Sequence, residues 1–178
     1  MSPLDVPFGI RDAVADDVPA LTAIYGHHVL HGTASFEVDP PSAVEMRHRF
    51  DDIMAQGYPY IVAVGASEVM AFAYAGPFRA RPAYRYSVED SIYIDSHWHR
   101  RGVGRALLDQ LIDACTGRGF RQMIAVIGDS ANAPSIGLHE GAGFTRAGLL
   151  AATGFKFGRW VDTVLMQRAL GHGDAILP

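Results

Sequence analysis

The chain has 178 residues, of which 49% are hydrophobic and 19% are charged, and 15 Lys and Arg against 19 Asp and Glu give a formal net charge of -4. This length and apolar content predict one globular domain over residues 1–178, with a core over about 10–170, and exclude a disordered chain. The mild acidity excludes a broad nucleic-acid surface, which needs clustered Lys and Arg, and no apolar run is long enough to span a membrane.

The chain starts with MSPLDVPFGIRD, which lacks the basic and then apolar pattern of a secretory signal peptide, so we expect a cytoplasmic protein. From Asp16 to about His31, apolar residues recur at helical spacing after an Asp-Asp pair that suits a helix N-terminus. Pro40-Pro41 then opens a second expected helix, which runs to about Gln56 and is ended by Gly57.

The middle of the chain consists of short runs rich in β-forming residues. The runs Tyr60–Val64, Val69–Ala75 and Val88–Ile94 are separated by the turn-like segment 65–68 and by the irregular segment GPFRARPAY. These patterns predict three consecutive strands.

The last third of the chain alternates helix and strand patterns. A helix is expected from about Gly102 to Gly117, a strand over Met123–Ile127, a short helix ending near GAGF, and a last strand over Val161–Arg168. The tail GHGDAILP, residues 171–178, is expected to be loose. This order of elements predicts an α/β (α+β) domain with helices on both faces of a sheet.

The single cysteine, Cys115, lies in the apolar stripe of the helix expected over 102–117. It cannot form an internal disulfide, and its place in the stripe predicts a buried, inert thiol rather than a nucleophile.

A strand, a short loop and a glycine-punctuated helix start follow one another in SIYIDSHWHRRGVGRALLDQLI. Gly102 and Gly104 would let the backbone approach a ligand, and the amides of a helix N-terminus suit a pyrophosphate. Arg100, Arg101 and Arg105 add local positive charge. The alternative is that these glycines only shape a turn. The loop is neither a GxxxxGK[ST] motif nor a complete dinucleotide fingerprint, which needs a third glycine.

The segment HRRGVG, residues 99–104, resembles the [Gln/Arg]-x-x-Gly-x-[Gly/Ala] signature of the GNAT superfamily of N-acetyltransferases. His99 departs from the pattern, because it stands where the family usually has Gln or Arg. The second landmark of the superfamily is matched by NAPSIGLHEGAGF, through Asn132, Ser135, Leu138 and the pair at 143–144.

Further stretches resemble the phosphinothricin and methionine sulfoximine acetyltransferase subfamily, over about residues 10–170. They are TASFEVDP, YAGPFRARPAYRYSVEDSIYI, AVIG, SIGLHEGAGF and GFKFGRWVDT. The resemblance implies the GNAT fold, in which helices cover both faces of a central mixed and mostly antiparallel sheet. It also implies a homodimer, and transfer of acetyl from acetyl-CoA to a primary amine by direct attack within a ternary complex.

The resemblance also assigns a cofactor site. Backbone groups of the strand before the loop would align the pantetheine, the loop amides would hold the pyrophosphate, and Asn132 would bind the cofactor arm. The residues expected to contact acetyl-CoA are Ile92, Tyr93, Ile94, Arg100, Arg101, Gly102, Val103, Gly104, Arg105, Asn132 and Ser135.

Two residues are expected to move protons. An ammonium cannot attack a thioester, and Glu89, in SVEDS, matches the subfamily's glutamate and is the expected base. Asp90 should point to the opposite face of the strand. His139 is the expected acid for the departing thiolate, since an imidazole titrates near pH ~6.5. The alternatives are a solvated strand-end carboxylate and a helix histidine that only packs.

The acceptor should be chosen by an aromatic residue and a basic loop. Guanidinium groups suit a carboxylate and an anionic phosphinate or sulfoximine-like group, and Arg79 matches the subfamily's substrate-binding arginine. The alternative is that the loop arginines are merely exposed. The expected acceptor-binding residues are Phe36, Arg79, Arg81, Tyr84, Glu89, Asp90 and Ser91.

No metal is expected, although several histidines, His27, His28, His31, His97 and His99, cluster loosely in the sequence. His27 and His31 share a helix face but lack the glutamate of an HExxH motif. Two other functions stay open: a non-catalytic acyl-CoA-binding sensory domain, and a GNAT enzyme for another amine such as a polyamine or a protein N-terminus. The loop arginines disfavour polycations, because like charges repel.

Overall fold

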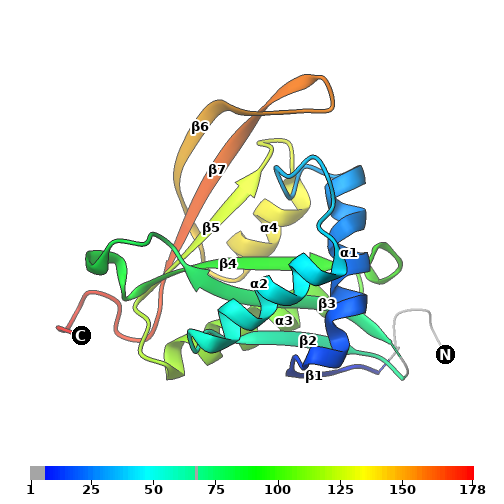
Figure 1. Ribbon diagram of the computed structural model, residues 1–178. Coiled ribbons are helices and arrows are strands. Elements are labelled where there is room, and N and C mark those ends of the chain that lie inside the picture. Colours follow the sequence, from blue (N-terminus) through cyan, green and yellow to red (C-terminus); the bar gives the residue numbers. More distant parts are fainter. Residues whose placement is uncertain (1–6, 67) are drawn as a thin grey trace.

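The computed structural model describes residues 7–66 and 68–178, in which helices flank a twisted sheet (Figure 1). Of the segment 1–12 that was tested for a signal peptide, residues 1–6 lie outside the described residues, as does residue 67 of the expected turn. The helices and strands are, in chain order, β1 Gly9–Asp12, α1 Val18–His31, α2 Ala43–Ala55, β2 Tyr60–Val64, β3 Val69–Pro77, β4 Ser87–Ile94, α3 Val103–Gly117, β5 Gln122–Gly128, α4 Ala133–Gly141, β6 Thr145–Lys156 and β7 Arg159–Ala169.

The strands form one sheet in the order β1-β2-β3-β4-β5-β7-β6. All neighbouring strands are antiparallel except β4 and β5, so the predicted mixed and mostly antiparallel sheet is confirmed. The parallel pairing of β4 with β5 begins at Ser87↔Gln122 and ends at Asp90↔Ala125. Beyond these pairs, β4 continues to Ile94 and β5 to Gly128, but the two strands no longer pair with each other. They therefore form a fork in the middle of the sheet.

Two apolar cores lie on opposite faces of this sheet, as the alternation of side chains along each strand requires. On one face, α3 packs its buried leucines against small residues of β3, including Ala71 and Ala73. On the other face, α1 and α2 cover aromatic residues such as Phe72 and Tyr93. Each fully buried leucine of α3 stabilises the fold by about 1.5–3 kcal/mol. The prediction of helices on both faces is therefore confirmed.

The predicted helices and strands are present, with ends that shift by a few residues, and one boundary is wrong. Pro40-Pro41 lies before α2 and not inside it. The helix begins after Ser42, whose hydroxyl accepts a hydrogen bond from the amide of Glu45 at 3.2 Å. A side chain that satisfies a first-turn amide stabilises a helix start more effectively than proline does here.

Two strands and the tail differ from the sequence prediction. β1 and β6 are strands that the pattern did not indicate. The tail over 171–178, expected to be loose, contains turns in which the amide of Gly173 donates to Leu170 O and that of Ala175 to His172 O.

Cys115 is fully buried in the α3 core, and burial raises its pKa to about 12. The thiolate is therefore scarce at neutral pH, which confirms the predicted inert thiol. Over 7–66 and 68–178, no helix is both long and apolar enough to cross a membrane.

Candidate active site

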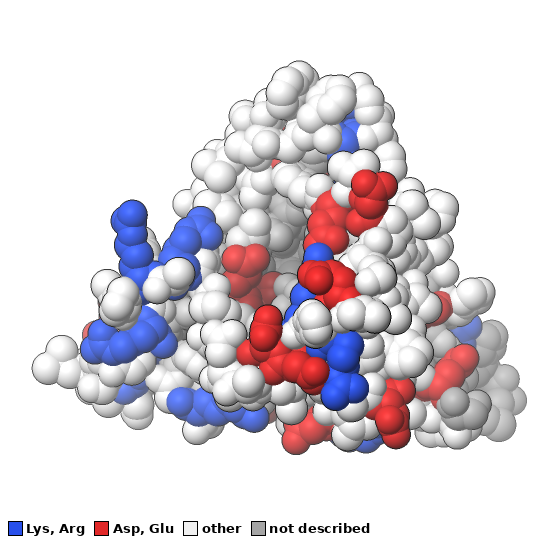
Figure 2. All heavy atoms as spheres, viewed as in Figure 1, with Lys and Arg blue, Asp and Glu red and all other residues white. Residues whose placement is uncertain are grey.

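A cavity of about 320 Å3 opens at the fork between β4 and β5. Figure 2 shows this face hollowed, with acidic side chains around the hollow and basic ones gathered over the loop between β3 and β4. Many of the predicted site residues line the cavity: Phe36, Glu89, Asp90, Ser91, Ile92, Tyr93, Asn132, Ser135 and His139. Residues far apart in the sequence thus meet at one place.

Glu89 is half-buried on the α1 and α2 face of β4, where its carboxylate lines the cavity. Burial is the main cause that raises its pKa, the charge of Asp90 raises it further, and the positive charge of Arg79 acts in the opposite direction. A carboxylate whose pKa is raised toward neutrality is a better proton acceptor than an exposed one.

Asp90 points to the other face, as predicted, and meets His139 of α4. Asp90 Oδ2 lies 3.0 Å from His139 Nε2, and both side chains are almost fully buried. His139 Nδ1 donates to the carbonyl of Ser135 at 2.7 Å, so this nitrogen carries a proton. Burial lowers the pKa of His139, but the hydrogen bond and the charge of Asp90 outweigh it, and the net shift is upward. The pair therefore favours an imidazolium facing a carboxylate.

The second carboxylate oxygen of Asp90, Oδ1, is buried and has no hydrogen-bond partner among the described residues. A buried acceptor without a donor costs about 1–3 kcal/mol. Since Asp90 also lines the cavity, a ligand that brings an N–H or O–H group to Oδ1 would relieve this cost.

Glycines shape the start of α3, beside the open end of β4. Gly102 has φ of 79°, a left-handed conformation that favours glycine, and open space around its Cα. A Cβ on Gly104 would come within 2.6 Å of Ile94 Cδ1, so this glycine lets α3 pack closely on β4. The backbone conformation thus explains the glycine at 102, and close packing explains the one at 104. The free amides of the first turn of α3 point toward the loop.

The loop side chains have distinct contacts. Arg105 does not reach back to the loop, because Nη1 donates to Gly141 O at 2.7 Å and Nε to Asp109 at 2.7 Å. The guanidinium of Arg101 lies 5.0 Å from the ring of Trp98. Any contact that Arg105 makes with a cofactor is therefore through its backbone, as the sequence prediction assumed.

His99, which departs from the family motif, contacts β4, the strand expected to bind the cofactor. Its Nε2 lies 3.2 Å from the carbonyl of Ile94, to which His28 Nε2 also donates at 2.8 Å. Burial lowers the pKa of His28, and the nearby histidines lower it further. Two imidazoles thus hold the last carbonyl of β4.

The residues expected to bind the acceptor include Phe36 and side chains of the basic loop between β3 and β4. Phe36 is 39% exposed at the cavity, whereas Arg81 and Tyr84 are exposed and do not line it. Arg79 is also exposed, with its guanidinium 4.4 Å from the ring of Phe78, but its charge reaches Glu89. Arg79 therefore does not line the cavity either, and its charge affects the site through the pKa of Glu89.

The sequence analysis missed several residues of the cavity. Tyr74 lies opposite Ser91 in the register of β3 and β4, and Gly128 and Thr163 come from β5 and β7. Tyr74 lies just before the GPFRARPAY segment, and the cross-strand register with Ser91 is the signal that could have found it.

No group of three or more His, Cys, Asp or Glu side chains within residues 7–66 and 68–178 is arranged to hold a metal ion. The rings of His27 and His31 lie 4.7 Å apart on α1.

Comparison with known proteins is consistent with this geometry. Residues 27–144 match the model of the Acetyltransferase (GNAT) family. The chain is 53% identical over 169 residues to a phosphinothricin N-acetyltransferase of Alcaligenes faecalis, covering 95% of this chain and 84% of that protein. It is 39% identical over 159 residues to an L-methionine sulfoximine/L-methionine sulfone acetyltransferase of Pseudomonas aeruginosa, covering 89% and 92%.

Among solved structures, a GNAT superfamily phosphinothricin acetyltransferase from Sinorhizobium meliloti, in complex with AcCoA, superposes with a TM-score of 0.93. Its sequence is 51% identical, and the match covers 96% of this chain and 92% of that one.

Proposed function

The chain belongs to the GNAT acetyltransferase family, and from that premise we propose that it transfers acetyl from acetyl-CoA to the α-amine of a small amino-acid analogue. Phosphinothricin, methionine sulfoximine and methionine sulfone are the acceptors that its relatives' names suggest. The observation that carries the proposal is the meeting of Glu89 with the Asp90–His139 pair at the fork of the sheet.

The features of the fork support an acetyl-CoA site. The edge of β4 beyond Asp90 does not pair with β5, so its backbone groups, other than the Ile94 carbonyl that His28 and His99 contact, are available to an extended pantetheine. The α3 start supplies backbone amides and the positive end of a helix dipole for the pyrophosphate. Asn132 caps α4 by accepting from the amide of Ser135 at 3.3 Å, which fixes its side chain beside the cavity. The bound acetyl-CoA would supply an activated acyl group.

Glu89 is the proposed base. It would take a proton from the ammonium of the acceptor, directly or through water, and leave a neutral amine that can attack a carbonyl. Its raised pKa favours this step, since the carboxylate holds a proton more strongly than that of an exposed glutamate.

The Asp90–His139 pair is the proposed proton source for the departing thiolate. Both nitrogens of His139 already have partners, Ser135 O and Asp90 Oδ2, so a proton would leave the imidazolium through Asp90. The proton would move from His139 Nε2 to Asp90 Oδ2, and rotation of the resulting carboxyl group would turn its O–H toward the cavity, where Oδ1 has no partner among the described residues. The thiolate would then take this proton and leave Asp90 ionised.

Arg79 is the proposed partner of the acceptor's anionic groups. Its side chain does not line the cavity, but its positive charge acts on Glu89, and a guanidinium forms strong charge-assisted hydrogen bonds with a carboxylate or phosphinate. Arg81 and Tyr84 would contribute only if the loop closes on a bound acceptor.

We further propose a homodimer that works in the cytoplasm, where acetyl-CoA is made. The support is an apolar surface on the β6–β7 hairpin, which extends beyond the rest of the molecule in Figure 1. Its exposed large side chains are Leu149, Leu150, Phe155, Phe157 and Trp160. Patches of this kind are usually covered by a partner, and sedimentation of wild type against Trp160→Glu would test this surface.

The experiment for the activity is a panel of acceptors. Release of thiol from acetyl-CoA would be followed with phosphinothricin, methionine sulfoximine, methionine sulfone, spermidine and a peptide. We expect release with the amino-acid analogues. Release only with spermidine or the peptide would assign another amine, and binding of acetyl-CoA without release would support a sensory domain.

A further inference from the structure

We propose that Lys156 is a positioning residue of the acceptor site. It does not line the cavity itself, but it fixes the loop that carries Phe36. The expected effect on acceptor binding rests on the proposed function, whereas the contact of Lys156 with this loop does not depend on it. The acceptor loop is defined here as residues 32–41, which connect α1 to α2.

Lys156 is the only lysine of the chain, and only 4% of it is exposed. Its ammonium donates to the carbonyl of Gly32 at 2.8 Å and to that of Ser35 at 2.7 Å. Burial lowers its pKa, and the charge of Glu37 opposes that shift. A buried cation is costly unless it is well bonded, so these two bonds hold the acceptor loop against the end of β6.

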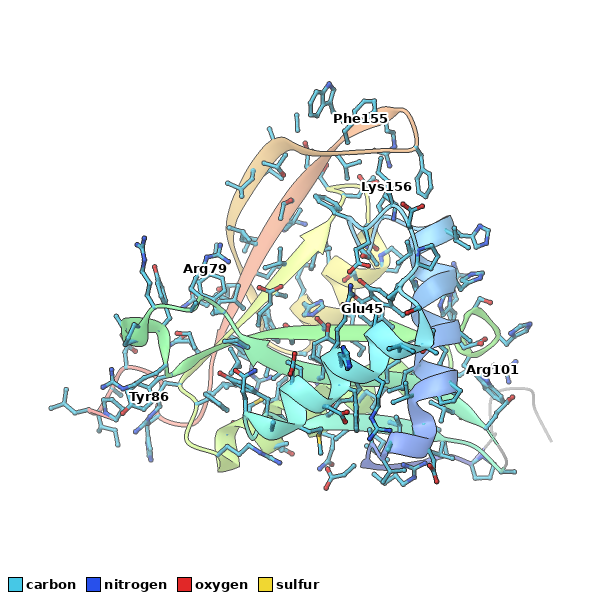
Figure 3. All side chains as sticks on the ribbon, in the orientation of Figure 1. Glu45, Arg79, Tyr86, Arg101, Phe155 and Lys156 are labelled. Carbon is cyan, nitrogen blue, oxygen red and sulfur yellow. The ribbon has the colours of Figure 1, made fainter. Side chains whose placement is uncertain are left out.

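Two further links join the acceptor loop to the same end of the β6–β7 hairpin, one direct and one through Asp129. A Cβ on Gly154 would lie 2.5 Å from Phe36 Cε2, so the Phe36 ring packs directly on the backbone of β6. Arg159 binds Asp129, and Thr33 Oγ1 donates to the same carboxylate at 3.4 Å. Figure 3 shows Lys156 where the hairpin meets the upper end of α1.

The loop fixed in this way forms one wall of the cavity. Ala34, Ser35 and Phe36 all line it, and Phe36 stands exposed at its mouth. The α3 start packs in the core on the opposite face of the sheet, whereas the ammonium of Lys156 donates to the acceptor loop. Loss of the Lys156 contacts should therefore disturb the acceptor and leave the cofactor in place.

The test compares Lys156→Met with Arg146→Met, which removes a cation from the same strand. Arg146 is exposed and pairs with Glu140 of α4 at 3.2 Å, away from the acceptor loop. We expect Lys156→Met to raise the acceptor KM about 10- to 100-fold, as misplacement of a binding group does. Its Kd for acetyl-CoA should stay within about two-fold of wild type, and Lys156→Arg, which keeps the donors, should recover part of the loss.

A second variant covers the case in which Lys156→Met does not fold. Gly154→Ala keeps every hydrogen bond but pushes on the Phe36 ring, and it should give the same rise in acceptor KM with unchanged acetyl-CoA affinity. Wild-type acceptor kinetics in Lys156→Met or, where that variant is unfolded, in Gly154→Ala would overturn the proposal. So would a parallel loss of acetyl-CoA affinity.

Hydrogen exchange separates this proposal from the proposed function. Peptides covering residues 32–38 should take up deuterium faster in Lys156→Met than in wild type and Arg146→Met, whatever the acceptor. Unchanged uptake in these peptides would refute the contact even if the enzyme acetylates phosphinothricin. Faster uptake in a protein that acetylates no amino-acid analogue would leave the contact standing and refute the activity.

Discussion

Glu89 is the residue on which the proposed chemistry depends most. Glu89→Gln keeps the size of the side chain but cannot take a proton, so kcat should fall about 10²- to 10⁴-fold. The loss should shrink at high pH, where more of the acceptor amine is already neutral. In wild type, activity should fall on acidification at a pH above the usual ~4.3 of a glutamate, because the pKa of Glu89 is raised. Profiles of kcat/KM against pH measure both effects, and a Glu89→Gln rate within a few-fold of wild type would remove it as the base.

Arg79 is a cation whose charge acts on the pKa of that base. Arg79→Ala should raise the KM for a carboxylate-bearing acceptor and leave acetyl-CoA binding nearly intact. The loss of a charge-assisted pair is about 1.5–3 kcal/mol in a dry site, and the high exposure of Arg79 points to the lower end of that range. Wild-type kinetics in this variant, measured with phosphinothricin, would make Arg81 the next residue to test.

The pair of His139 and Asp90 should make the free energy of unfolding depend on pH. The pKa of His139 is raised in the folded protein, so the pair stabilises the fold fully below the unfolded value near ~6.5. This contribution is lost as the pH rises through the folded pKa. The difference in unfolding free energy between wild type and His139→Gln should therefore be larger at pH 5.5 than at pH 9, pH values chosen on either side of about 6.5. A difference that does not change with pH would mean that the pKa of His139 is the same in the folded and the unfolded protein.

At the scale of elements, the two glycines at the start of α3 should respond differently to substitution. Gly104→Val would force Ile94 Cδ1 away and separate α3 from β4, and overpacking of this kind costs about 1–3 kcal/mol. Because the displaced amides are those proposed for the pyrophosphate, acetyl-CoA affinity measured by calorimetry should drop strongly. Gly102→Ala is the control, since it strains the backbone but meets open space. Equal affinity in Gly104→Val and wild type would exclude the loop from the cofactor site.

Helices and strands that bury one face could be predicted from their periodicity, as α3 shows with its leucine stripe. β6 could not, because nearly all its residues are exposed and no alternation marks a buried side. β1 is a four-residue edge strand, too short for a pattern to appear. Both missed strands therefore lack the burial signal on which such a prediction depends.

At the scale of the whole molecule, site residues were predictable where the chain itself carries a motif. β4 and the start of α3, which are expected to bind the cofactor, lie in one stretch of the sequence. The family resemblance pointed to Glu89 and His139, both of which line the cavity. Lys156 was not identified, because its partner Ser35 lies 121 positions earlier, and only the folded chain joins them. The partnership of Asp90 with His139 likewise depends on α4 packing under β4.

The central claim is acetylation of an α-amine at the fork of the sheet, and the most direct measurement is identification of the product. Phosphinothricin and acetyl-CoA would be incubated with wild type and with Glu89→Gln, and acceptor and thiol quantified by mass spectrometry. The account predicts phosphinothricin heavier by one acetyl group on its amine, formed mole for mole with free CoA and almost absent with Glu89→Gln. Free CoA without acetylated acceptor, or equal product from both proteins, would contradict it.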